Sequence, residues 1–510
     1  MKKQSLIKGS LILGIAGIIT RFLGLFFRWP LIMLIGDEGI GYYQMSYPLY
    51  MFFVAMASGI PITVSKLISE NNAVNNIKGN FEVIKETIIL MIMLGFGTSF
   101  VLFFFSKSII VFLNWDSKAY YSLVGISFAP LIVSLLMAFR GFFQGFQSMT
   151  YPAISQILEQ IGRVVFGVGL AVLLLPKGIE YSAGGAAFGA AAGGLIALIY
   201  LYFKYIKVKR QYKIKNIQCN TEMLGKILKI SIPISLGATA SSIMNLMDSI
   251  LVPNNLIKAG LSSKNATILY AQLTGKASVI INIPFTLSIA ICTSLLPIIA
   301  ELFVLKKRDK LRKKVNTAIK ISQIISIPCT LGLFFLASPI MNLIFPGRAD
   351  GADILKYLSI VIPFIVVTQV TTSILQGIGR YISPVINLII GCIIKMILTI
   401  VLVRQSNINI YGAVIATIVA YVIVAILNVI RIKRKINIRI DIFNNFIKPL
   451  FASVIMIITV LICYMQLYTY TGSNGIACLL SISIGGIIYI LAIVVLKIFS
   501  IKEIKSKMDS

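Results

Sequence analysis

Most of the chain consists of apolar runs that are long enough to cross a lipid bilayer as helices. Such a helix needs roughly 20 mostly apolar residues. Lipid admits only helices and closed barrels, because every backbone polar group must be hydrogen-bonded within the protein. Hydrophobic residues fill 58% of the 510 positions and charged residues 13%, unlike the composition of soluble proteins. The predicted spans lie at about 8–35, 41–65, 84–113, 120–143, 152–175, 182–203, 228–252, 268–300, 317–345, 354–377, 383–403, 410–430, 446–470 and 475–499.

These runs predict an all-α polytopic membrane protein with about fourteen transmembrane helices. Lysine and arginine crowd alternate connections, namely the N-terminus, 204–229, 306–320, 431–448 and the tail from 497. The positive-inside rule assigns that side to the cytoplasm, so both termini are expected inside, in a bacterial plasma membrane. The other connections are short and leave no room for an extracytoplasmic catalytic domain. The first apolar run is longer than a signal-peptide core and is expected to be retained.

The net charge of +30 does not indicate nucleic-acid binding, because the basic residues punctuate apolar runs and form no basic face on a soluble domain. Histidine is absent, which removes the commonest general base and metal ligand. Gly275-Lys276 lacks the remaining residues of a phosphate-binding loop. We therefore expect no catalytic residues, no metal and no bound cofactor.

An internal repeat divides the chain. Four features recur at a constant offset of about 232 positions, and an even number of spans in each copy predicts a parallel repeat. The predicted organisation is a six-helix lobe at 1–204, a basic linker at 205–227, a second six-helix lobe at 228–432, and two further helices with a basic tail at 433–510. The matching positions are Gln144-Gly145 with Gln376-Gly377, Pro152 with Pro384, Ile154 with Ile386, and Arg163 with Lys395.

Arg21 and Arg28 lie inside the first predicted span. One arginine near the centre of a span costs about 2.5–3.5 kcal/mol on insertion scales. Seven residues are two helical turns, so both side chains project from one face, roughly 10 Å apart along the axis. That pattern favours a cationic pair facing a polar cavity, whereas snorkelling to the two headgroup layers is the alternative interpretation.

The other intramembrane charges are interpreted from their neighbours. Glu159 and Arg163 are four residues apart with the acid first, which favours an intrahelical ion pair. Lys395 occupies the repeat position of Arg163 without an acid four residues before it. Arg140, beside the repeated Gln-Gly, is interpreted as a headgroup anchor.

The first seventy residues resemble the stage V sporulation and lipid II flippase branch of the multidrug/oligosaccharidyl-lipid/polysaccharide exporter superfamily. The layout of six, six and two spans extends the resemblance over the whole chain. The residues that carry the resemblance are Lys8-Gly9-Ser10, Thr20-Arg21-Phe22-Leu23-Gly24, Arg28, Ile35-Gly36-Asp37-Glu38-Gly39, and Gly59-Ile60-Pro61-Ile62-Thr63-Val64-Ser65-Lys66.

The resemblance implies a central cavity lined by the first, second, seventh and eighth spans. It also implies an undecaprenyl-pyrophosphate-linked sugar as cargo, membrane lipids as surroundings and cell-wall synthesis proteins as partners. Arg21 matches a family cavity arginine, and Arg28 fits the sporulation-type spacing. Lys276 on the eighth span and Asp248 on the seventh complete the expected substrate-binding set. Asp248 either pairs with a cavity arginine when cargo is absent or takes a cation.

Lys66 and Glu70, at the inner end of the second span, admit two interpretations, a cytoplasmic gate and a surface ion pair. The implied function is an alternating-access flippase for a cell-wall precursor, with lipid II for spore cortex as the favoured cargo. Coupling to the membrane potential, Na⁺ or H⁺ stays open.

The sequence leaves three alternative functions. A multidrug antiporter of the same superfamily would use Asp248 as its cation site, but basic residues outnumber acidic ones in the expected cavity. A membrane glycosyltransferase would use Asp37 and Glu38, which lie in a connection too short for such enzymes. A non-catalytic scaffold would not need the cavity charges.

Overall fold

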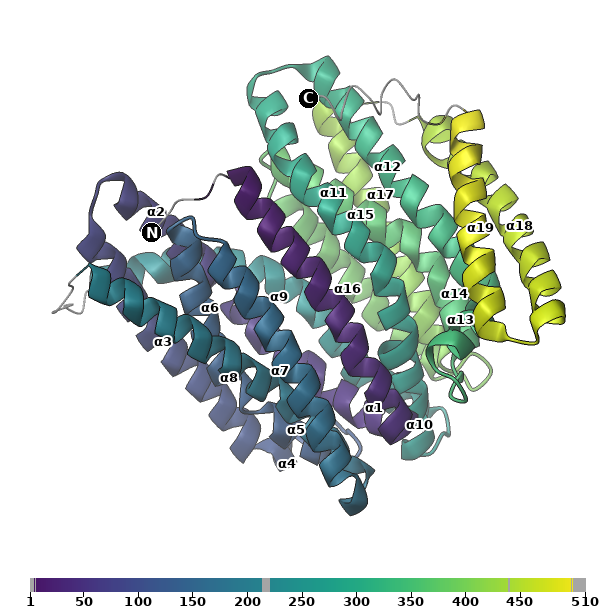
Figure 1. Ribbon diagram of the computed structural model, residues 1–510, viewed down its shortest axis with the longest axis horizontal. Coiled ribbons are helices and arrows are strands. Elements are labelled where there is room, and N and C mark those ends of the chain that lie inside the picture. The colour runs from purple at the N-terminus through teal and green to yellow at the C-terminus, as the bar shows by residue number, and fades with distance from the viewer. Residues whose placement is uncertain (1–3, 5, 213–220, 439–440, 497, 499–510) are drawn as a thin grey trace. The chain divides into compact units, whose positions relative to one another are not determined.

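The computed structural model describes the chain except residues 1–3, 5, 213–220, 439–440, 497 and 499–510 (Figure 1). All regular elements in the described part are helices. Eleven helical segments of the described part, some of which join neighbouring elements, are long and apolar enough to cross a membrane, so the protein is a multi-pass membrane protein. One of the eleven, Ile12–Ala73, contains two predicted spans, because it runs through a kink at Gly36. The count of fourteen stays a prediction.

The first compact unit comprises residues 1–271. Within it, α7 packs on α8 and α1, while α9 packs on α1, α2 and α3. Its helices are α1 (Leu6–Ala57), α2 (Gly59–Ala73), α3 (Ile77–Phe104), α4 (Ser106–Phe112), α5 (Ala119–Ile126), α6 (Ala129–Gly145), α7 (Thr150–Leu174), a 3₁₀ turn (Leu175–Lys177), α8 (Ile179–Gln211), α9 (Thr221–Lys258) and α10 (Ser263–Ala271).

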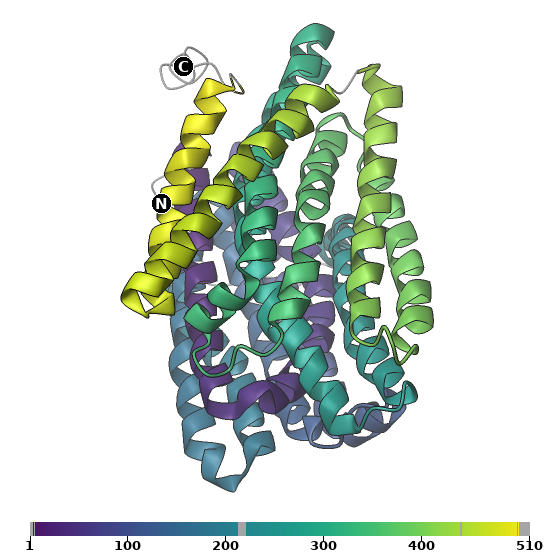
Figure 2. The same ribbon diagram turned by 90° about the vertical axis from the view of Figure 1, so that its right-hand side faces the viewer.

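The second compact unit comprises residues 272–510. Here α18 and α19 pack on each other and appear side by side in Figure 2. Its elements are a π-helical turn (Gln272–Ala277), α11 (Ser278–Val304), α12 (Arg308–Phe335), α13 (Ala337–Ile344), α14 (Ala352–Leu358), a 3₁₀ turn (Ser359–Val361), α15 (Ile362–Gly377), α16 (Ile382–Val403), α17 (Tyr411–Ile436), a second π-helical turn (Phe443–Ile447), α18 (Lys448–Thr471) and α19 (Asn474–Val495).

The compact units divide later in the chain than the predicted lobes do. The repeat places the boundary in the linker 205–227, of which 213–220 lie outside the described residues, whereas the units divide between Ala271 and Gln272. The cause is the packing of α9, whose Ser235 hydroxyl accepts a hydrogen bond from the Gly59 amide at 3.1 Å.

The repeated motif marks the same helix boundaries in both units. The Gln-Gly pairs end α6 at Gly145 and α15 at Gly377. Two residues later, Gln147 and Gly379 both adopt left-handed backbone angles, with φ of 55° and 78°. The repeat seen in the sequence therefore corresponds to matching helix ends.

Gly36 reverses the direction of α1. Its φ of 64° and ψ of −172° fall in a region that essentially only glycine occupies. Sixteen residues of continuous helix would separate Phe27 from Tyr43 by about 24 Å, yet their ring centroids are 6.0 Å apart. Tyr43 also stacks on Tyr47 at 5.4 Å. The reversal thus joins Phe27, Tyr43 and Tyr47 into one aromatic wall.

Replacing Gly36 with alanine is expected to lower the free energy of unfolding by about 1–3 kcal/mol, because the new Cβ disfavours this conformation. Thermal unfolding of the detergent-purified protein measures the effect. Gly14→Ala is the matched control, since a Cβ there has no neighbour within 4 Å. Equal melting temperatures for the two variants would contradict a requirement for glycine at the reversal.

Candidate functional site

Arg21 and Arg28 lie on α1 before the reversal, in a continuous stretch of helix. The side chain of Arg21 is exposed and that of Arg28 is half-buried. The Arg28 guanidinium lies within electrostatic range of Tyr43, Tyr47 and a second guanidinium, that of Arg163. Two cations therefore lie close together inside the first unit.

Arg163 reaches this place from α7. Its guanidinium carbon lies 5.6 Å from the ring centroid of Phe27 and 5.1 Å from that of Tyr47, which are cation–π distances. Tyr43 accepts a hydrogen bond from the same guanidinium. The aromatic wall thus surrounds Arg163, and Arg28 lies beside it.

The structure gives Glu159 an ion-pair partner other than the predicted Arg163. Glu159 instead accepts a 2.7 Å hydrogen bond from Arg140 Nη2, and Arg140 Nε donates to the Ser155 hydroxyl at 2.9 Å. Arg140 comes from α6, so the pair joins neighbouring helices. The interpretation of Arg140 as a headgroup anchor is corrected by the same contact. The i,i+4 rule overlooked this partner because it compares positions on one helix only.

Lys276 lies in the π-helical turn and is fully buried. Its Nζ donates to the carbonyl oxygens of Arg348 at 2.8 Å and Asp350 at 3.3 Å, and it lies 5.9 Å from the Phe345 ring centroid. In this structure Lys276 therefore holds the connection between α13 and α14, which the sequence did not predict.

Asp248 lies on α9 and is half-buried. The next residue, Ser249, accepts a 2.8 Å hydrogen bond from the indole of Trp115 through its carbonyl oxygen. This contact anchors the helix that carries Asp248 within the first unit. The role of Asp248 as a ligand or cation site stays a prediction.

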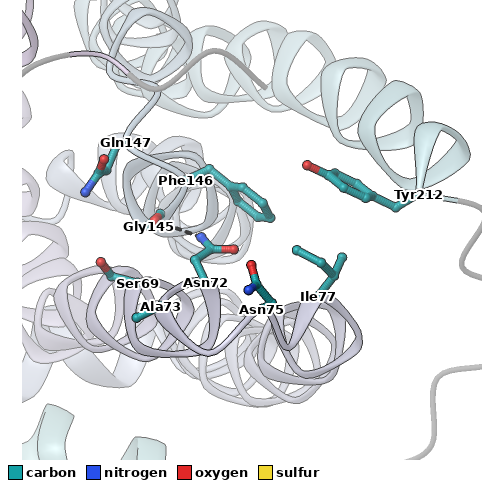
Figure 3. A pocket seen from close by; sticks show the side chains of 9 residues that line it. All are labelled: Ser69, Asn72, Ala73, Asn75, Ile77, Gly145, Phe146, Gln147 and Tyr212. Carbon is teal, nitrogen blue, oxygen red and sulfur yellow. Dashed lines mark hydrogen bonds between the residues drawn. The ribbon is translucent and has the colours of Figure 1, made fainter.

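Lys66 and Glu70 form an i,i+4 pair on α2 at 3.8 Å, with both side chains 58% exposed. Exposed pairs of this kind contribute little to stability. The same end of α2 borders a cavity of about 280 Å³ (Figure 3), in which Asn72 donates to the Gly145 carbonyl at 3.3 Å. The cavity is lined by Ser69, Asn72, Ala73, Asn75, Ile77, Gly145, Phe146, Gln147 and Tyr212. A gating role for Lys66 and Glu70 stays a prediction.

Glu38 is held by local contacts. Its carboxylate accepts a 2.8 Å hydrogen bond from the Tyr42 hydroxyl and pairs with Lys264 at 3.0 Å and Lys118 at 3.7 Å. These contacts fit a structural role at the end of the helix. Over the described residues, no group of three potential acidic, histidine or cysteine ligands is arranged to hold a metal ion.

Comparisons with known proteins identify the family. A family model described as "Polysaccharide biosynthesis protein" matches residues 6–303, which is more than half of the chain. The chain belongs to this family of polysaccharide biosynthesis proteins. A second model, MatE, matches residues 233–401. Together with the relatives below, these matches assign the chain to the multidrug/oligosaccharidyl-lipid/polysaccharide exporter superfamily, as the resemblance indicated.

Relatives and a solved structure extend the similarity over most of the chain. Stage V sporulation protein B of Bacillus subtilis is 28% identical over 87% of this chain and 86% of its own. The lipid II flippase MurJ of the same organism is 27% identical over 84% and 83%. A structure titled "Lipid II flippase MurJ, inward closed conformation" has a TM-score of 0.74 and 19% identity, and covers 94% of this chain and 98% of that one. That structure shows a shared fold.

The pairing of Glu159 with Arg140 can be tested by a double-mutant cycle. Arg140→Gln and Glu159→Gln are each expected to lower the free energy of unfolding by about 1–3 kcal/mol, because each leaves a charged group without its partner. The loss of unfolding free energy in the double variant should be smaller than the sum of the losses in the two single variants. The difference, which is the coupling energy of the pair, should be at least about 0.5 kcal/mol. A cycle of Arg163→Gln with Glu159→Gln is the control, and a larger coupling there would restore the intrahelical pair.

Proposed function

We propose that this protein is a flippase that moves an undecaprenyl-pyrophosphate-linked cell-wall precursor from the inner to the outer leaflet of a bacterial plasma membrane. Lipid II is the favoured precursor, with a role in the spore cortex. The names of two relatives support this, since a sporulation protein and a lipid II flippase are each similar over more than four fifths of the chain.

The cationic face of α1 carries the proposal. Arg28 lies beside another guanidinium, and the described residues place no carboxylate in an ion pair with it. A diphosphate supplies several negative charges and oxygens that match guanidinium forks. The exposed Arg21, two turns before Arg28, is the proposed first contact for the ligand. Lys276 is left out of the proposed site because it is buried against backbone carbonyls.

Alternating access would then carry the bound headgroup across while the prenyl tail stays in lipid. An interior that is negative by 100 mV favours outward movement of one negative charge by about 2.3 kcal/mol when the full field is crossed. The membrane potential is therefore a proposed driving force, and coupling to Na⁺ or H⁺ is a further one. Both termini are proposed to be cytoplasmic, and cell-wall synthesis proteins are the proposed partners.

A cation-coupled multidrug antiporter is the second candidate. It is favoured by the match of the MatE model to residues 233–401, a segment that contains Asp248. In that function Asp248 would bind the cation. The arginines of α1 would then be dispensable for transport.

Translocation in reconstituted vesicles distinguishes the two functions. The native chain is expected to flip a fluorescent polyprenyl-diphosphate sugar, and Arg21→Ala to slow this at least about tenfold, the effect of losing one charged hydrogen bond. Arg380→Ala, which removes an exposed arginine outside the helices, is the control. Transport of a cationic dye that is lost in Asp248→Asn but kept in Arg21→Ala would overturn the flippase in favour of the antiporter.

A further inference from the structure

Arg163 is a half-buried cation, and not all of its hydrogen-bonding groups have partners. Its Nε and Nη2 atoms are shielded from solvent and have no hydrogen-bond partner among the described residues. Each buried, unsatisfied donor costs about 1–3 kcal/mol, and more when the group is charged. Stacking on Phe27 and Tyr47 recovers only part of this. The arrangement therefore leaves two guanidinium nitrogens able to bind an additional ligand.

The rotation of α7 fixes Arg163 in this position. On one side α7 packs closely on α8, where a Cβ on Gly193 would overlap the Glu159 carbonyl oxygen and the Arg163 amide nitrogen. On the other side, Gly24 of α1 lies against Gln160, and Phe27 lies against Gly167. Arg163 falls between these two α1 contacts. The close contacts at these glycines therefore orient the Arg163 side chain toward α1.

The nearby carboxylate of Glu159 is bound by a different arginine. Glu159 is one turn earlier on α7, but Arg140 binds it at 2.7 Å and is itself held by Ser155. Arg28, the residue after Phe27 on α1, is a second positive charge within electrostatic range of Arg163. The Arg140–Glu159 pair therefore leaves two guanidiniums together, facing the same aromatic wall.

We propose that Arg163 is a ligand-binding residue, and that Arg28 and Arg163 form a two-guanidinium site for a diphosphate, walled by Phe27, Tyr43 and Tyr47. This rests on the proposed function and locates the headgroup between α1 and α7, within the first unit. The free nitrogens of Arg163 donate to phosphate oxygens, next to the rings of Phe27 and Tyr47. Arg140 is a positioning residue, since it keeps Glu159 from neutralising the site.

Binding of farnesyl diphosphate to the purified full chain in nanodiscs tests the site, with farnesol as the ligand that lacks the charged group. Isothermal titration is expected to show farnesyl diphosphate binding about 10- to 100-fold more weakly to Arg163→Gln, the range for a charged hydrogen bond. The affinity of Arg163→Lys for farnesyl diphosphate should lie between those of the native chain and Arg163→Gln, because lysine keeps the charge but lacks the forked guanidinium. Lys395→Gln, at the matching repeat position on α16, is the control and should bind normally.

Thermal stability without ligand separates binding from folding. Arg163→Gln is expected to melt at the same temperature as the native chain or higher, because it removes a charge that has no carboxylate partner. A lower affinity combined with undiminished stability is not the result of a structural defect.

Rescue tests the positioning role. Arg140→Gln should weaken farnesyl diphosphate binding by releasing Glu159 toward Arg163, and the double variant with Glu159→Gln should restore it. Failure of the second substitution to restore binding would overturn the role of Arg140.

Native-like binding by Arg163→Gln, together with weakened binding by Arg28→Gln, would overturn the assignment of Arg163 and leave the proposed function intact. A native chain that binds farnesyl diphosphate no better than farnesol would overturn the diphosphate ligand, and with it the proposed function.

Discussion

A charge inside a membrane protein needs a counter-charge, a dipole or a ligand, because lipid provides no water to solvate it. Three charges in the described part of this protein meet this requirement locally. Glu159 has Arg140, Glu38 has Lys264, and Lys276 has two backbone carbonyls. Arg163 is different, since its neighbours are aromatic rings and another arginine. This imbalance is what distinguishes a candidate site from structural ion pairs.

Two backbone features place Arg163 against aromatic rings. The reversal at Gly36 brings Phe27 and Tyr43 together although they are far apart along α1. The glycine contacts of α7 with α8 and α1 determine the direction in which Arg163 points. Neither feature depends on a charged side chain. The electrostatics of the site therefore depend on uncharged positions whose substitution would displace the guanidiniums.

The all-helical membrane fold could be predicted from the sequence, because the length of the apolar runs alone dictates it. The repeat could also be predicted, and its Gln-Gly pairs end α6 and α15 in the structure. The partner of Glu159 was not predictable. The sequence has no periodic pattern that shows how two apolar helices are rotated relative to each other. Arg140 on α6 could therefore not be recognised as the partner. The contacts of Lys276 were not predictable for a related reason. Lys276 lies in a π-helical turn and donates to backbone carbonyls, and no residue pattern marks that turn.

The proposed diphosphate site lies wholly within residues 1–271. A headgroup that touches residues of one unit only keeps the same protein contacts whatever arrangement the other unit takes. Its affinity is then equal in the two access states, and a ligand with equal affinity for two states does not shift the balance between them. In such a carrier the direction of transport comes from outside the site: from the field across the membrane, from the concentrations of cargo in the two leaflets and from any coupled ion.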